Sequence, residues 1–170
     1  MIIGGIAVIA RGVPRLTVDI DATVWGAAVS LDDLFATLEG NQILPRISEA
    51  RELARRRQIL LLEHRPTGTP LDISLGWLPF EEEALRRAST VDFGGLSIPV
   101  PQPEDLLVYK AVAWRERDKE DIERLLLLHA DEIDLDRVRS WVRQFAEALE
   151  EPERIQELEV LLRKTLGRRD

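Results

Sequence analysis

The chain has 170 residues, of which 45% are hydrophobic and 32% are charged. This length and composition suit one folded domain with its own core and exclude a disordered protein. There is no cysteine, which excludes disulfide bonds and thiolate metal ligands, and His64 and His129 are too isolated for a zinc site. The apolar runs are too short to cross a membrane, and no basic segment precedes the first one. We therefore expect a cytoplasmic protein without a membrane partner.

The charge is spread unevenly. Residues 1–70 contain eight arginines and eight acidic residues, so the rest of the chain carries the whole net charge of −8. General attraction to nucleic acid is therefore not expected, and no DNA partner is predicted. The arginines near one predicted helix, at 51, 55, 56 and 57, form either a local basic patch or a solvated helix face. The solvated face is the preferred interpretation, because such charge runs are common.

The first two dozen residues hold the most informative pattern. Met1 to Ile3 predicts a short strand, Gly4-Gly5 follows, and the next apolar run fits a helix. The β-branched run from Arg15 to Val24 predicts a strand. Because side chains alternate along a strand, Asp19 and Asp21 are expected on one face, about 7 Å apart. The neighbouring apolar residues are then expected to point into a core: Val18, Ile20 and Ala22.

The two acids and the two glycines indicate different parts of one site. Two carboxylates on one face repel each other unless a cation lies between them, and the usual partner is an oxygen-seeking ion such as Mg²⁺ or Mn²⁺. Glycines at Gly4 and Gly5 let backbone N–H groups approach phosphates closely. Together these features suggest chemistry on a nucleotide.

Two helices and a hairpin are predicted next. Ser30 caps a helix that ends near Gly40, and a second helix covers about 47–56. The apolar run 58–63 has the length of a strand, the turn residues 65–70 follow, and 71–75 predicts a second strand with Asp72 in it. Asp is depleted in strands, so Asp72 is either a functional acid or an edge-strand acid that faces water.

The remainder predicts a short helix, a hairpin and a helical tail. The helix covers 80–89, and the hairpin 90–100 turns at Gly94-Gly95. The expected helices of the tail are 103–115, 118–130, 134–149 and 152–166, with Asp118 and Asp134 as caps. We therefore predict a core of residues 1–100 and a helical region of residues 101–170 packed on it.

Two blocks of residues resemble one known fold family. The first is Gly-Gly-x-Ala-Val, a gap containing Gly12, and then Arg15-x-Thr17-x-Asp19-Ile-Asp21. The second is Lys110, followed by an Arg-Asp-x-x-Asp pattern that begins at Arg117. In this order the blocks resemble the nucleotidyltransferase fold, above all the abortive-infection toxin-type and minimal nucleotidyltransferases of prokaryotes.

The resemblance implies a fold and an activity. The expected fold is α/β (α+β), with a small mixed sheet of nucleotidyltransferase type flanked by helices and followed by a helical bundle. The implied reaction moves a nucleoside monophosphate from an NTP to an acceptor hydroxyl on RNA, for example tRNA, on a protein or on a small molecule. Mg²⁺ or Mn²⁺ is the implied cofactor, and a cognate toxin or antitoxin is an implied partner.

The resemblance also assigns roles to residues. Asp19, Asp21 and Asp72 are the implied catalytic and metal-binding carboxylates. The implied nucleotide-binding residues are Gly4, Gly5, Arg15, Thr17, Lys110 and Asp118. The alternative function is a catalytically silent protein of the same fold that binds another protein.

Lys110 and Asp118 have two interpretations each. Lys110 either contacts the triphosphate, unpaired until phosphate arrives, or is a surface lysine. Asp118 either supports the site or moves a proton, or is only a helix cap. Helical spacing puts four residues on one face, unless the helix breaks between Arg115 and Asp118: Lys110, Trp114, Arg117 and Asp121.

Overall fold

A five-stranded mixed sheet lies at the centre of the computed structural model, which describes residues 1–167. Its strands are β1 (Ile2–Ile3), β2 (Ile20–Trp25), β3 (Ile43–Pro45), β4 (Ile59–His64) and β5 (Thr69–Gly76). Their order across the sheet is β1-β2-β5-β4-β3, and only the β2–β5 pair is parallel. A separate hairpin is formed by β6 (Ser89–Phe93) and β7 (Leu96–Val100).

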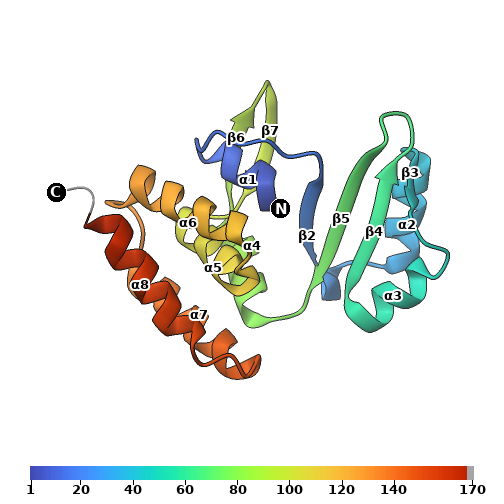
Figure 1. Cartoon of the computed structure of the whole chain (residues 1–170). Coiled ribbons are helices and arrows are strands. Elements are labelled where there is room, and N and C mark those ends of the chain that lie inside the picture. Colours follow the sequence, from blue (N-terminus) through green and yellow to red (C-terminus); the bar gives the residue numbers. More distant parts are fainter. Residues whose placement is uncertain (168–170) are drawn as a thin grey trace.

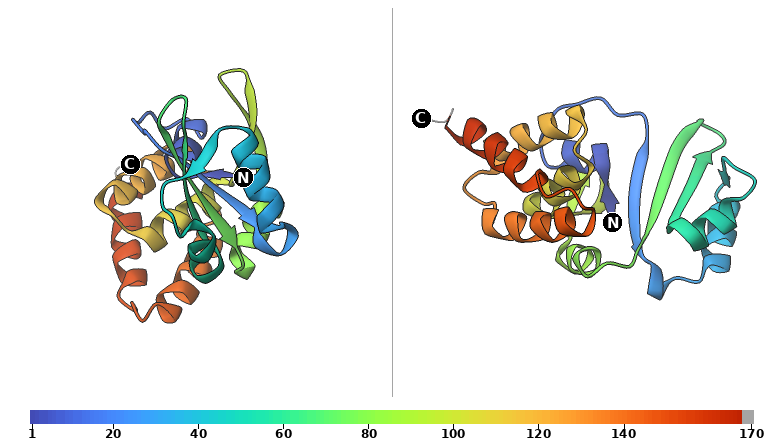
Figure 2. Two further views of the ribbon diagram at one scale, coloured as in Figure 1. Left: turned by 90° about the vertical axis from the view of Figure 1, so that its right-hand side faces the viewer. Right: turned by 60° about the horizontal axis from the view of Figure 1, so that its bottom comes forward.

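Helices lie on both sides of this sheet (Figure 1). Those of the first half of the chain are α1 (Gly4–Ala10), the 3-10 turn η1 (Gly26–Ala28), α2 (Leu31–Gly40), α3 (Ala50–Arg57) and α4 (Pro79–Arg87). Those of the second half are α5 (Pro103–Ala113), α6 (Glu116–His129), α7 (Leu135–Ala148) and α8 (Arg154–Leu166). The right-hand view of Figure 2 also shows that α5–α8 lie on one side of the sheet, and α2 and α3 on the other.

One face of the sheet packs against α2 and α3. The alternation along β2 points Ala22 and Val24 to this face, where they meet the fully buried Leu60 and Leu62 of β4. Phe35 of α2 is a buried member of the same cluster. Alternation of apolar side chains with period two therefore builds this half of the core.

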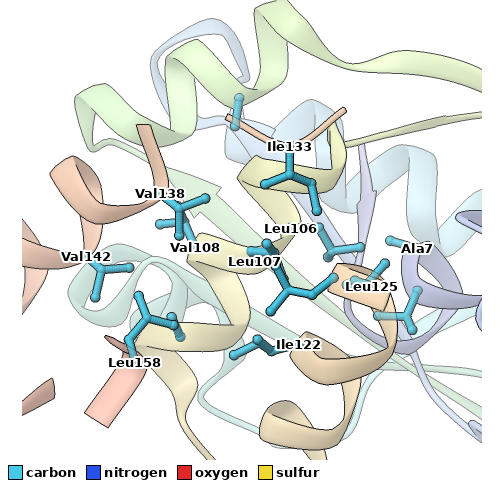
Figure 3. Packing of buried hydrophobic residues seen from close by; sticks show 14 of the residues in the cluster. Ala7, Leu106, Leu107, Val108, Ile122, Leu125, Ile133, Val138, Val142 and Leu158 are labelled. Atoms are coloured by element: carbon cyan, nitrogen blue, oxygen red, sulfur yellow. The ribbon is translucent and has the colours of Figure 1, made fainter. Parts of the chain in front are cut away.

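A second apolar cluster joins α1 to the helices of the second half. Figure 3 shows Leu106 and Leu107 of α5, Leu125 of α6 and Ala7 of α1 pointing toward one another. All four side chains are completely buried. This packing holds α1, and with it the Gly4-Gly5 turn, against the helical tail.

The predicted mixed fold is confirmed, and most predicted elements are present within a few residues of their expected bounds. Ser30 and Asp134 cap their helices as expected, because each side chain accepts a hydrogen bond from a backbone N–H three residues later. Strand β3 was not predicted. It is only three residues long and ends in Pro45, so neither periodicity nor β propensity marks it. The predicted division at residue 100 stays a prediction, and residues 168–170 of the predicted helical region lie outside the described residues.

The strand predicted from Arg15 is much shorter in the structure. Residues 12–19 form an irregular loop, and β2 begins only at Ile20. The prediction that Val18 points into the core is therefore wrong, because its side chain is 83% exposed. Leu16 is 89% exposed as well. The β-branched run gives local propensity for a strand, but no neighbouring strand pairs with this segment, so propensity alone does not build one.

The chain breaks between α5 and α6, at the place where the sequence left two alternatives. Trp114 adopts a left-handed conformation with φ 52°, and Arg115 is the N-cap of α6. The expectation that Asp118 is the cap is wrong, because Asp118 is the third residue of the helix and accepts a hydrogen bond from the Arg115 backbone N–H at 3.1 Å. The break also overturns the single helical face proposed for Lys110 and Asp121.

Within residues 1–167, none of the helices is both long and apolar enough to traverse a bilayer.

Candidate functional site

Asp21 and Asp72 lie side by side on neighbouring parallel strands. They are direct register partners across the β2–β5 pair, so their side chains leave the same face of the sheet. Adjacent strands are about 4.8 Å apart, which brings two carboxylates much closer than the sequence separation suggests. Ile3 of β1 is the next residue in the same row. The structure therefore places two of the three predicted acids together at the centre of the sheet.

Gly4 lies directly against the Asp21 carboxylate. It has a φ of +61°, and a Cβ built there would lie 1.9 Å from Asp21 Oδ2. At Gly5 a Cβ would lie 2.6 Å from the Thr17 hydroxyl oxygen. Both glycines are thus required by close approach of the backbone to side chains of the predicted site, which is the reason for glycine at this turn.

Asp19 is on the loop just before β2 and is exposed. The Thr17 hydroxyl donates a hydrogen bond to its Oδ1 at 2.6 Å. This bond is the main cause of a lowered pKa of Asp19, and the nearby positive charges of Arg15 and Arg117 lower the pKa further. Asp19 is therefore held as a carboxylate.

The environment of Asp21 has the opposite effect. Burial raises the pKa of Asp21, and the negative charges of Asp19 and Asp72 raise it further. Lys110 and Arg115 oppose this shift. The three predicted carboxylates thus act on one another electrostatically, and the repulsion is concentrated on Asp21.

Asp72 already has a cationic partner. Arg46, which follows β3, forms a salt bridge with Asp72 Oδ1, and both side chains are one-third exposed. The backbone N–H of Arg46 bonds to the Leu61 carbonyl, and Leu61 is the register partner of Asp72 on β4. Arg46 therefore extends the row of Asp21 and Asp72 to the far edge of the sheet.

A buried group of four charges connects the helical tail to the loop of residues 12–19. The Lys110 ammonium lies 2.8 Å from Asp118 Oδ1 and 2.9 Å from Asp121 Oδ2. The same Asp121 oxygen accepts a hydrogen bond from Arg15 Nη1. None of the four side chains is more than 9% exposed. We call these residues, Arg15, Lys110, Asp118 and Asp121, the charge cluster.

Each interpretation of Lys110 is contradicted in one respect by the charge cluster. Lys110 is not a surface lysine, since it is almost completely buried. It is also not unpaired, because two carboxylates contact its ammonium group. Two positive and two negative charges balance within the cluster, which is what burial of charged groups requires.

The donor atoms at this site suit a hard divalent cation. Carboxylate oxygens are the ligands that Mg²⁺ and Mn²⁺ take, and the crowding of acids around Asp21 is the repulsion that a cation relieves. Asp21 and Asp72 fit this role best, with Asp19 approaching from the loop. As the side chains stand, no three acidic or histidine residues within 1–167 converge closely enough to hold an ion.

The structure gathers most of the predicted site residues at one end of the sheet. Gly4, Gly5, Arg15, Thr17 and the predicted acids lie around β1 and β2, and the charge cluster adds Lys110 and Asp118. Their roles stay predictions. The sequence-based assignment omitted two members, Arg46 and Asp121. Asp121 is the last residue of the Arg-Asp-x-x-Asp pattern, which was a usable signal, whereas nothing near Arg46 marks it.

The chain resembles one known family, whereas a search of curated proteins gives no match. A family model described as "Nucleotidyltransferase of unknown function (DUF6036)" matches residues 1–165. That range contains the whole site, and the narrower resemblance to the abortive-infection toxin-type branch stays a prediction. The chain therefore belongs to this family of nucleotidyltransferases of unknown function.

Proposed function

We propose that this protein transfers a nucleoside monophosphate from an NTP to an acceptor hydroxyl, with Mg²⁺ or Mn²⁺ as cofactor. The observation that carries the proposal is the register pair of Asp21 and Asp72, with the backbone of Gly4 against the Asp21 carboxylate. Paired carboxylates beside a close backbone approach suit a metal-bound triphosphate. Family membership supports the same reaction class.

The protein residues have separate tasks in this proposal. Asp21 and Asp72, with Asp19, hold the cation, which supplies charge stabilisation for the reacting phosphate. Thr17 keeps Asp19 ionised through its hydrogen bond. Gly4 and Gly5 allow the backbone to lie directly against Asp21 and Thr17. In this proposal Lys110 and Arg15 exchange a carboxylate partner for a phosphate, with Asp118 in support.

The test compares single charge removals in a transfer assay. The purified protein is incubated with each radiolabelled NTP and Mg²⁺ against total RNA, cell protein and small-molecule extracts. We expect Asp21→Asn and Asp72→Asn to lower transfer by roughly a hundredfold or more, the scale of losing a main electrostatic contact. Asp136→Asn is the matched control, because the Asp136 side chain is 94% exposed on α7. Equal transfer by all four proteins would refute the metal-dependent reaction.

A second function is favoured by the charge pairing. Asp72 is bound by Arg46, and Lys110 by two carboxylates, so the charges of these two residues are balanced without any ligand. This balance suits a catalytically silent member of the fold that acts as a toxin or antitoxin partner. If growth effects of the expressed protein survive Asp21→Asn and Asp72→Asn together, the protein acts by binding.

A further inference from the structure

A pocket of about 270 Å³ adjoins the carboxylate row. Ile3 and Ser74 of the sheet form its floor, and residues of α4, α5 and α7 form its walls. The wall residues are Leu78, Phe80, Glu81, Tyr109, Val112, Ala113 and Phe145. None of the predicted site residues lines this pocket, and the proposed function leaves it without a role.

The position of the pocket relative to the carboxylates is fixed by strand register. Ser74 is two residues beyond Asp72 on β5 and pairs with Thr23, which is two residues beyond Asp21 on β2. Two residues along a strand span about 7 Å. The loop with Arg15 and Thr17 joins the opposite end of β2. Along this strand, the order is therefore the loop with Arg15, the carboxylates, and the pocket.

The residues that line the pocket favour an uncharged ligand. Most of the lining is apolar or aromatic, and Glu81 is its only charged residue among those described. Glu81 Oε2 is already occupied, because it accepts hydrogen bonds from the backbone N–H groups of Trp77 and Leu78, both at 3.0 Å. With no cation in the wall, nothing compensates the phosphates of a nucleic-acid backbone. An uncharged ring buries apolar area here at no electrostatic cost.

Hydrogen-bonding capacity is left over at the pocket wall. The Tyr109 hydroxyl is buried and has no hydrogen-bond partner within residues 1–167. The Thr23 hydroxyl, in the row of Ser74, is in the same condition. Thr23 itself does not line the pocket, whereas Tyr109 does. Buried hydroxyl groups are normally paired, so the unpaired Tyr109 hydroxyl in the wall points to a ligand with a polar atom.

We propose that this pocket holds the acceptor, and that the acceptor is a hydroxyl carried on an uncharged, largely apolar ring such as a phenol. The inference rests on the proposed function. In the reaction the acceptor oxygen forms a bond to the α-phosphorus, the bond from that phosphorus to the pyrophosphate oxygen breaks, and the acceptor proton passes to water. Attacking and leaving oxygens lie roughly in line. Pyrophosphate held beside Arg15 therefore places the attacking hydroxyl across the carboxylates, at the mouth of the pocket.

The experiment fills the pocket from its exposed rim. Ala113 is the last residue of α5, is exposed and lines the pocket, so Ala113→Phe narrows the pocket without changing the core. Ala113→Leu gives a smaller obstruction. Ala36→Phe is the matched control, since Ala36 is exposed on α2 at the other face of the sheet. Thermal unfolding confirms that each variant folds.

Three probes are titrated into each protein and followed by NMR: p-cresol, ATP with Mg²⁺, and inorganic tripolyphosphate with Mg²⁺. We expect p-cresol to shift the amide signals of Ser74, Tyr109 and Ala113 in the wild type. Ala113→Phe is expected to weaken p-cresol binding by roughly tenfold or more, and Ala113→Leu by less. The affinities for ATP and tripolyphosphate should stay within about twofold of wild type, and Ala36→Phe should change nothing.

Two results would overturn the proposal. In the first, p-cresol leaves the pocket amides unchanged or binds Ala113→Phe as well as wild type. In the second, Ala113→Phe weakens ATP but not tripolyphosphate, which assigns the pocket to the nucleobase. Failure of the proposed function has a different signature, because neither ATP nor tripolyphosphate then binds the wild type. A protein tyrosine and a free phenol are distinguished by labelling with ATP in the presence of a tyrosine peptide or p-cresol.

Discussion

Gly4 shows how one residue ties backbone conformation to the site. It has a φ of +61°, and an added Cβ would overlap the Asp21 carboxylate. Gly94 has the same φ of +61° in the β6–β7 turn, but an added Cβ there meets no atom within 4 Å. Alanine substitutions at the two glycines therefore separate the free-energy cost of backbone strain from the cost of steric overlap.

We expect Gly4→Ala to destabilise the protein by about 2–4 kcal/mol, since overpacking adds to the strain of a positive φ. Gly94→Ala should cost only about 1 kcal/mol, from the strain alone. Urea unfolding of the two variants measures the difference. Equal losses would mean that Asp21 moves aside freely.

The raised pKa of Asp21 makes the stability of the folded protein decrease as the pH rises. Its pKa is raised in the folded protein by burial and by the charges of Asp19 and Asp72, so the native state binds the proton more tightly than the unfolded chain. Stability is therefore lost as pH rises from the unfolded pKa of about 3.9 through the raised folded value. The loss is complete once the pH is above the raised folded value.

Asp21→Asn should consequently raise the melting temperature at pH 7 and have little effect near pH 3. Melting curves from pH 3 to 8 test this, with Asp136→Asn as the exposed control. A gain that is the same at every pH would show that the mutation acts through packing and not through charge.

At the scale of elements, the charge cluster connects α5 and α6 to the loop before β2. The Asp121 carboxylate forms salt bridges with Lys110 of α5 and with Arg15 of the loop. Because the four side chains are nearly buried, removing one charge leaves its partners without compensation. An unpaired Lys110 would contribute almost nothing to stability, whereas the paired lysine of the structure is expected to contribute substantially.

We expect Lys110→Ala to lower the free energy of unfolding by about 3–5 kcal/mol. Lys119→Ala, which removes an ion pair with the exposed Glu116, should cost no more than about 1 kcal/mol. Urea unfolding gives both values, and hydrogen exchange should show loss of protection in the neighbouring loop only for Lys110→Ala. A small effect of Lys110→Ala would mean that water replaces the ammonium group.

The elements also show what sequence can predict. Caps, glycine turns and apolar periodicity are local, and they located nearly every helix and hairpin. Residues 15–19 failed because strand formation needs a partner strand, which local propensity does not supply. Arg46 was missed for a similar reason, since its contact with Asp72 depends on register across two strands. Asp21 and Asp72 could be singled out as acids in strands, but only the parallel pairing makes them neighbours.

At the scale of the whole molecule, two apolar clusters share one sheet. Leu60 belongs to the cluster beneath α2 and α3, and Leu125 to the cluster of α1 and the helical tail. Strand β2 faces both sides, with Val24 packed toward the first cluster and Asp21 on the opposite face. The two apolar clusters are therefore connected through the central strands, and we expect them to unfold together.

We expect Leu60→Ala and Leu125→Ala each to cost about 2–5 kcal/mol, since both side chains are fully buried. Both should lower the midpoint of a single cooperative transition. Calorimetry and circular dichroism together check this. Two separated transitions in either variant would show that the sheet and the helical tail unfold independently.

The parallel pairing of β2 with β5 has a consequence for the order of folding. Asp21 and Asp72 are 51 positions apart in the sequence, and α2, α3 and two further strands lie between them along the chain. Closing so long a segment is entropically costly, and contacts of this range form slowly. Chains in which β2 and β5 have not yet paired therefore lack the neighbouring carboxylates of Asp21 and Asp72. In the proposed function, a divalent ion that needs both carboxylates would bind only after the central strands have paired, and would then stabilise the finished structure.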